Sequence, residues 1–124
     1  MKAIETDVVD VWRDRQRAYL ATAASLDRAL EHEHNLGLSE FEILDLVADH
    51  KSDECAMRDI VDLTPMTQSA LSRVVDRLTK AGLVERKECS YDRRSMFVGL
   101  TAEGAAVHKR ARKLYRSMLA EELS

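Results

Sequence analysis

The spacing of hydrophobic residues predicts an amphipathic helix in the middle of this chain. Its apolar positions are separated by three or four residues, as on one face of a helix: Leu71, Val74, Val75 and Leu78. The opposite face is polar, with short hydroxyl side chains and an amide near its start and cations further along. Thr67 is a good N-cap, and Gly82 can adopt the left-handed conformation that commonly follows a helix. We therefore expect a helix between these two residues.

Two short strands are predicted after this helix, at residues 83–87 and 95–100. In the second, Met96, Val98 and Leu100 alternate with other residues, as in a half-buried strand. The polar loop between the strands, 88–94, ends in two arginines. A helix followed by a hairpin with a basic tip is the order of elements in a winged helix-turn-helix. In that arrangement the helix reads base edges in the major groove and the wing reaches a neighbouring minor groove.

Four further helices are predicted around this unit. Residues 3–34 lack Gly and Pro and carry apolar residues at helical steps, which predicts one helix of ~45 Å that ends at Asn35. Ser39 and Glu42 form a capping-box pattern that opens a helix over 39–49. Residues 56–63 would be the first helix of the helix-turn-helix. Thr101 caps a last helix over 101–119, with an apolar inner face: Ala105, Val107, Ala111, Leu114 and Met118.

Composition limits the classes of protein that fit. The chain has 124 residues, 45% of them hydrophobic, which is enough for one domain with a core. It has no run of 18 apolar residues and no basic segment leading into an apolar one, so we expect a cytoplasmic protein that neither crosses a membrane nor is secreted. Two cysteines provide no disulfide framework. With four glycines, no phosphate-binding Gly-rich loop and no nucleophile elbow, the sequence does not predict an enzyme.

Charge is distributed unevenly along the chain. The net charge is −3, but residues 1–63 hold 7 Lys+Arg against 15 Asp+Glu, whereas residues 64–116 hold 12 against 5. The basic half contains the predicted helix and wing. Because affinity for DNA depends on cations that displace its counterions, the second half is the expected DNA-binding part and the acidic first helix is not.

Residues 70–104, ALSRVVDRLTKAGLVERKECSYDRRSMFVGLTAEG, resemble the signature of MarR-family transcriptional regulators. The matching positions are Ser72 with Arg73, 76–78, Gly82, 84–86, Asp92 with Arg94, 100–101 and Gly104. The resemblance implies a mainly α fold with a small β-hairpin wing, in which residues 38–100 form a winged helix-turn-helix lobe. It also implies that 1–36 and 101–124 form dimerisation helices within a single domain, 1–124. Relatives commonly continue for about 20 more residues, so a weaker dimer, or one that relies more on the first and last helices, is expected.

The resemblance further implies a homodimer on double-stranded DNA with a pseudo-palindromic site, and repression rather than activation. The predicted DNA contacts lie on the helix and the wing: Thr67, Gln68, Ser69, Ser72, Arg73, Arg77, Lys87, Asp92, Arg93 and Arg94. Arg94 would enter the minor groove with Asp92 bracing it. Two readings of Arg77 stay open, a phosphate contact or an ion pair with a carboxylate such as Asp76 or Glu85. A merely solvated helix face and hairpin are the alternative for the whole set.

Sites for small molecules are less well defined by the sequence. Many MarR relatives respond to small aromatic or phenolic effectors, and four aromatic residues are candidates for such a cleft, although core packing explains them better: Trp12, Tyr19, Phe41 and Tyr115. Cys89 lies among cations that would lower the pKa of its thiol, so redox control is an alternative. His32 and His34 lie on nearly opposite sides of a helix, so no metal site is expected, and no cofactor is implied.

One alternative from another functional class stays open. Winged helices also bind proteins, and the acidic first helix could serve a protein partner, with only weak DNA binding that does not depend on sequence. The Ser72–Arg73 pair and Arg94 argue against this alternative, since a module that had lost DNA binding would not need that spacing.

Overall fold

The computed structural model describes residues 7–50, 55–88 and 96–124. Its helices and strands, in chain order, are α1 (Val8–His34), α2 (Leu38–Asp49), β1 (Cys55–Ala56), α3 (Met57–Leu63), α4 (Gln68–Lys80), β2 (Val84–Glu88), β3 (Met96–Leu100) and α5 (Ala102–Leu123). The strands form one antiparallel sheet in the order β1-β3-β2. The predicted fold class, mainly α with a small β-hairpin, is confirmed.

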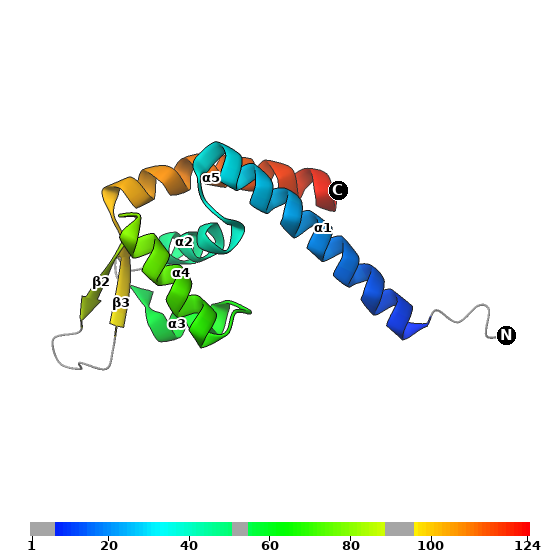
Figure 1. The fold of residues 1–124 in the computed structure, drawn as a ribbon, viewed down its shortest axis with the longest axis horizontal. Helices are drawn as coiled ribbons and strands as arrows, with labels where there is room; N and C mark the ends of the chain where they lie inside the picture. Colours follow the sequence, from blue (N-terminus) through cyan, green and yellow to red (C-terminus); the bar gives the residue numbers. More distant parts are fainter. Residues whose placement is uncertain (1–6, 51–54, 89–95) are drawn as a thin grey trace.

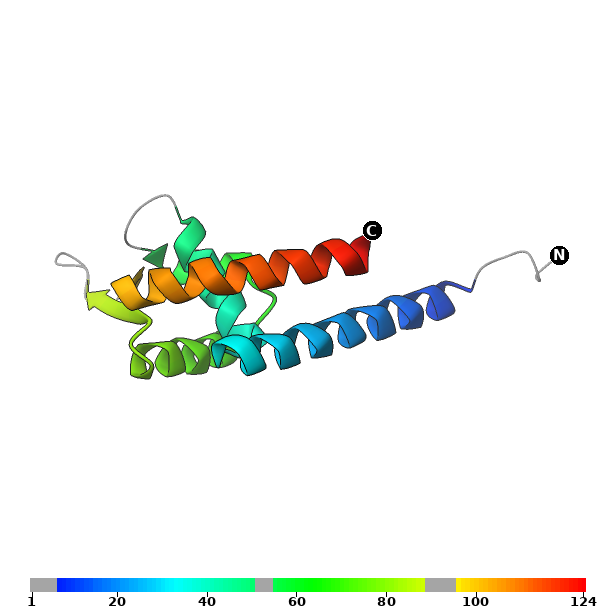
Figure 2. The ribbon, with the colours of Figure 1, turned by 90° about the horizontal axis from the view of Figure 1, so that it is seen from above.

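The helices and the sheet form two parts that differ in shape. α2, α3, α4 and the sheet make a compact lobe, and α5 runs along one side of it (Figure 1). α1 packs against α5 and α2, and its N-terminal half extends well beyond the lobe (Figure 2). None of the helices in the described part of the chain has both the length and the apolar character needed to cross a membrane.

The ends of α1 show how local hydrogen bonds set the helix boundaries. The helix begins at Val8 rather than at residue 3, because Asp7 is its N-cap and the Asp7 carboxylate accepts a hydrogen bond from the Val9 N–H at 2.9 Å. At the other end, Asn35 adopts a left-handed conformation with φ of 54°. The predicted stop at Asn35 is therefore confirmed, and the predicted start was too early.

The start of α2 corrects the predicted capping box by two residues. Gly37, not Ser39, is the N-cap, and the Glu40 carboxylate accepts a hydrogen bond from the Gly37 N–H at 2.9 Å. The next N–H, of Leu38, donates to the Asp27 carboxylate of α1 at 2.8 Å. A side chain on another helix thus satisfies one of the free amides at the start of α2, and this contact joins α1 to the lobe.

Replacing Glu40 with Ala is expected to lower the free energy of unfolding by about 1 kcal/mol, because the capping hydrogen bond to Gly37 is lost. Urea denaturation monitored by circular dichroism measures this change. Glu33→Ala, at an exposed position on α1, serves as the control and should change stability by less than about 0.5 kcal/mol. Equal effects of the two substitutions would argue against the capping role of Glu40.

A third strand, β1, was not predicted from the sequence. Its two residues pair with β3, Cys55 opposite Val98 and Ala56 opposite Phe97. Two residues are too few to show an alternating pattern, and the strand exists because β3 offers it an edge. The following helix, α3, begins at Met57, one residue later than predicted, with Ala56 as its N-cap.

The core lies where α2 meets α4, α5 and the sheet. On α2, Phe41, Ile43 and Leu44 are fully buried, in agreement with the prediction that this helix is central. The four apolar residues predicted for the inner face of α4 are buried as well. Val84 of β2 and Val98 of β3 complete the same cluster. This packing fixes the orientation of α4 and hence the direction of its polar face.

The last helix, α5, differs from the prediction in length and in one position of its inner face. It continues to Leu123 rather than ending near residue 119. Ala105 is exposed, whereas Gly104 is buried against the backbone at Leu83. Thr101 caps the helix as predicted, accepting a hydrogen bond from the Gly104 N–H at 3.0 Å. The Thr101 hydroxyl also donates to the Gly82 carbonyl at 2.6 Å, which ties the start of α5 to the end of α4.

Candidate nucleic-acid interface

Helix α4 presents a continuous polar face to the outside of the lobe. Thr67 caps it, accepting a hydrogen bond from the Ala70 N–H at 3.1 Å, and its four buried residues pack toward the core. At its C-terminal end Gly82 has a φ of 78°, the left-handed conformation that was predicted for this position. Both ends of α4 and its inner face are therefore set by its own sequence.

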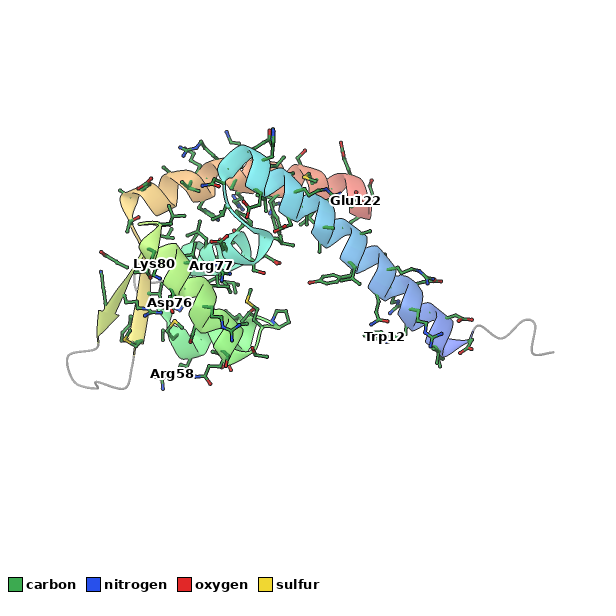
Figure 3. The ribbon with its side chains drawn as sticks, viewed as in Figure 1. Trp12, Arg58, Asp76, Arg77, Lys80 and Glu122 are labelled. Carbon is green, nitrogen blue, oxygen red and sulfur yellow. The ribbon has the colours of Figure 1, made fainter. Side chains whose placement is uncertain are left out.

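All the predicted contact residues on or beside α4 are exposed: Thr67, Gln68, Ser69, Ser72, Arg73 and Arg77. Ser69, Ser72 and Arg73 lie at helical steps on the side opposite the buried residues. The amide and hydroxyls are near the helix start, and the cations follow toward the C-terminal end. Figure 3 labels two of these cations, Arg77 and Lys80. Short hydrogen-bonding groups near the N-terminus of a helix, followed by arginines, suit contacts with base edges and phosphates in a major groove.

Arg77 has a partner that the sequence did not suggest. Its Nε lies 3.7 Å from Oε2 of Glu40 on α2, so the partner is neither Asp76 nor Glu85. Because the Arg77 side chain is still half exposed, this ion pair leaves the guanidinium within reach of solvent. Asp76 instead forms an ion pair with Arg86 of β2. That pair joins α4 to the first strand of the hairpin.

The hairpin is only partly described. Lys87 is exposed on β2, with Nζ 3.7 Å from the Glu85 carboxylate. The other predicted wing contacts, Asp92, Arg93 and Arg94, lie outside the described residues, and so does Cys89. The Asp76–Arg86 ion pair nevertheless places the base of the hairpin beside α4, so a wing that continues from β2 starts next to the polar face of that helix.

Two further cations belong to the same lobe but were not among the predicted contacts. Arg58 is exposed on α3, at the end of the lobe away from α5, and Lys80 is exposed near the C-terminal end of α4 (Figure 3). Lys80 was recognisable from its position on the polar face of α4. Arg58 carries no periodic signal that marks it as a contact, and only the position of α3 in the lobe shows that it is exposed at that end.

The four candidate effector residues do not form one site. Phe41 is fully buried, and its ring packs between His108, with centroids 5.8 Å apart, and Tyr115, with centroids 4.6 Å apart. Trp12 is exposed on the projecting part of α1 (Figure 3). Tyr19 and Tyr115, by contrast, both line a cleft of about 550 Å³ between α1, α2 and α5. Core packing is thus correct for Phe41 and in part for Tyr115, which packs against the core, whereas Trp12 and Tyr19 are exposed.

Two ionisable groups of this cleft have perturbed pKa values. Burial raises the pKa of the Glu42 carboxyl, a hydrogen bond from Tyr115 opposes the shift, and the charge of Asp45 adds to it. Burial and the neighbouring carboxylates also raise the pKa of the Tyr115 hydroxyl.

The structure shows no candidate metal site in the part of the chain that it describes. Within 7–50, 55–88 and 96–124, no group of three or more His, Cys, Asp or Glu is placed to hold a metal ion.

Comparison with known proteins gives a consistent result. The family model described as MarR family matches residues 34–95, which is half of the chain. The HTH-type transcriptional regulator MhqR of Bacillus subtilis (strain 168) is 32% identical over 88 residues, which make up 71% of this chain and 59% of MhqR. The chain thus spans less than two thirds of the curated relative that it matches.

Two solved structures resemble the whole fold. AbsC, a MarR family transcriptional regulator from Streptomyces coelicolor, superposes with a TM-score of 0.84 at 25% identity, over 95% of this chain and 80% of AbsC. Sco3205, a regulator of the same family and organism that was solved in complex with DNA, also has a TM-score of 0.84, at 28% identity, over 90% of this chain and 70% of Sco3205.

Proposed function

This chain belongs to the MarR family of transcriptional regulators, and on that premise we propose that it binds a specific double-stranded DNA site with α4 in the major groove. The observation that carries the proposal is the exposed polar face of α4, held outward by four buried residues on its other side. The DNA complex of Sco3205 supports the same role for this lobe. Arg58, Arg77 and Lys80 would add phosphate contacts at the edges of the interface. Such a regulator would work in the cytoplasm, where the DNA that it binds is located.

We propose that the regulator acts as a homodimer. The projecting half of α1 exposes large hydrophobic side chains to solvent: Val8, Val9, Trp12, Tyr19 and Leu20. A helix with such a surface gains stability when a second copy covers it. In this proposal, residues 1–36 and 101–124 form the dimerisation part of a single domain, and 38–100 form the DNA-binding lobe.

Replacing both Val9 and Trp12 with Glu is expected to weaken dimerisation by at least about 100-fold, because each substitution buries a charge in an apolar contact. Sedimentation velocity over a range of concentrations measures the change. Arg13→Glu/Arg17→Glu, at exposed polar positions of the same helix, provides the control for a general effect of added acidic charge. A parent protein that stays monomeric at high micromolar concentration would refute the dimer.

Two lobes related by a two-fold axis would read a pseudo-palindromic site, with recognition helices about one helical turn of DNA apart, roughly 34 Å. Binding at a promoter would then exclude RNA polymerase, and this is the proposed route to repression. DNase footprinting of the DNA upstream of the protein's own gene tests this spacing of the two half-sites. A protected region with two half-sites whose centres are about 10 base pairs apart is expected, and a single isolated half-site would contradict it.

For the wing we propose that Arg94 inserts into the minor groove, with Asp92 as its brace and Arg93 and Lys87 on phosphates. This proposal rests on the sequence motif. Arg94→Ala should weaken binding most on sites whose flanks have a narrow A·T-rich minor groove, where the potential that attracts arginine is strongest. Competition between duplexes that differ only in their flanks measures this preference, and an equal loss on all flanks would argue against minor-groove insertion.

A further inference from the structure

Helix α5 holds a large share of the positive charge in the second half of the chain. Residues 64–116 contain 12 Lys+Arg. Five of these lie on α5, and all five are exposed: Lys109, Arg110, Arg112, Lys113 and Arg116. Within the described residues none of the five forms an ion pair, whereas cations of α1, α4 and β2 do. Much of the basic charge is therefore neither on the α4 face nor paired with a carboxylate.

Four of these cations form a line along one side of the helix, and we call them the α5 stripe: Lys109, Arg112, Lys113 and Arg116. Their spacing of i, i+3, i+4 and i+7 makes them neighbours on the helix surface. The stripe lies opposite the buried Gly104 and Ala111. Like charges at these spacings repel each other and destabilise a helix, and no described carboxylate offsets the repulsion. A partner that brings negative charge would remove it.

The α5 stripe faces away from the surface proposed to read the operator. α2 packs against α4 on one side and against α5 on the other, and the stripe is on the outer side of α5. Seen from above, α5 lies over the lobe, and no described helix or strand crosses in front of it (Figure 2). A straight duplex held by α4 therefore does not reach the stripe, and affinity for the operator should not depend on it.

The surface around the α5 stripe lacks the features of a protein interface. Its exposed neighbours include Ala105, Ala106 and Ala120. On α5, which is described throughout, the large hydrophobic residue that is exposed is Leu123, well beyond the stripe. Protein partners bind mainly through buried aromatic and apolar anchors, and a two-fold contact centred on the stripe would set cations against cations. Cations without apolar anchors suit a phosphate backbone, for which charge supplies the affinity.

We propose that the α5 stripe binds the phosphate backbone of a second segment of double-stranded DNA while α4 holds the operator, an inference that rests on the proposed function. The stripe extends ~10 Å along the helix axis, which matches about three phosphate steps on one DNA strand. It offers cations and no short hydrogen-bonding side chains, so the contact would not depend on sequence. A protein bound to its operator is close to other segments of the same DNA, whose effective concentration is therefore high.

Capture of a second duplex tests the proposal. The full chain is bound to an immobilised duplex from the DNA upstream of its own gene, and a fluorescent scrambled duplex is added at low salt. The parent protein should retain the scrambled duplex. Lys109→Gln/Lys113→Gln/Arg116→Gln should retain at least about 10-fold less, because three phosphate contacts are lost. Affinity of this variant for the promoter duplex, measured by fluorescence anisotropy, should change by less than about 2-fold, because one arginine contact accounts for more than that.

Two controls accompany the capture experiment. Arg13→Gln/Arg15→Gln/Arg17→Gln removes the same charge from exposed positions on α1, and this variant should still retain the scrambled duplex. Thermal denaturation checks the fold of the stripe variant. Because Gln has a helix propensity close to that of Lys and Arg, and because the substitutions remove like-charge repulsion, the variant should be at least as stable as the parent.

Three results would overturn the proposal. A parent protein that fails to retain the scrambled duplex would leave an acidic protein as the partner of the α5 stripe. Equal losses in the two triple variants would mean that only net charge matters. A dimer weakened in the stripe variant alone, seen by sedimentation velocity, would assign the stripe to the contact between two copies.

Titration of the free chain with the scrambled and promoter duplexes separates this proposal from the proposed function. A chain with no preference for the promoter duplex refutes the proposed function. In that case, a loss of scrambled-duplex binding that is larger in the stripe variant than in Arg73→Ala would still place DNA on α5. Promoter binding without capture of the second duplex would refute only the role of the α5 stripe.

Discussion

Arg73→Ala is expected to weaken binding to the operator by about 10- to 100-fold, the loss typical of one arginine contact in a DNA interface. Arg73 is exposed on α4, on the side opposite the buried residues, and within the described residues it has no hydrogen-bond or ion-pair partner. Its guanidinium is therefore available to DNA, and its removal takes nothing from the fold. Fluorescence anisotropy with a labelled operator duplex measures the loss.

The salt dependence of the Arg73→Ala variant distinguishes the two kinds of contact. If Arg73 binds phosphate, the slope of log affinity against log salt should fall by about one and all sequences should weaken equally. If it contacts a base, discrimination at one position of the site should relax. Arg112→Ala is the matched control: it removes the same charge from an exposed position on α5, which lies across α2 from α4 (Figure 1). Equal losses in both variants would mean that only net charge matters.

Gly104→Ala is expected to destabilise the fold by about 3 kcal/mol, at the upper end of the usual cost of overpacking. A Cβ at Gly104 would lie 1.9 Å from the Leu83 carbonyl oxygen. The oxygen belongs to the backbone, and the backbone at residue 104 fixes the position of the Cβ, so neither atom can turn away. The start of α5 would have to move from the segment between α4 and β2. Thermal and urea denaturation measure the loss.

Ala105→Ser provides the control for Gly104→Ala, since position 105 is on the same turn of α5 but exposed. Its effect on stability should be within about 0.5 kcal/mol. A Gly104→Ala protein as stable as the parent would show that the backbone at Leu83 moves easily, and would contradict the close packing described for this junction.

The periodic parts of the fold were predictable from the sequence, and the parts set by distant partners were not. The buried face of α4, its cap at Thr67 and the left-handed Gly82 follow from residues close together in the chain. The start of α2 was misplaced because Ser39 and Glu42 also fit a capping box, and Asp27, from another helix, supplies one of the hydrogen bonds that set the true start. The two-residue strand β1 depends on β3 and leaves no pattern of its own.

The candidate site likewise has features that were predictable from the sequence and features that were not. Exposure of the residues on the polar face of α4 followed from helical spacing alone. The partner of Arg77 did not, since Glu40 lies on a different helix and nothing near Arg77 in the sequence points to it. Among the aromatic residues, spacing could not separate Phe41, which fills the core, from Tyr19, which lines a cleft. That distinction depends on how α1, α2 and α5 pack together.

The most direct test of specific DNA binding compares two labelled duplexes by fluorescence anisotropy at two salt concentrations. One duplex comes from the protein's own promoter region, and the other is a scrambled version of it. We predict a preference of at least about 10³-fold for the promoter duplex, with affinity for both falling steeply as salt rises. Equal, weak binding to the two duplexes, with sedimentation showing an intact dimer, would contradict the account and favour a protein partner for this winged helix.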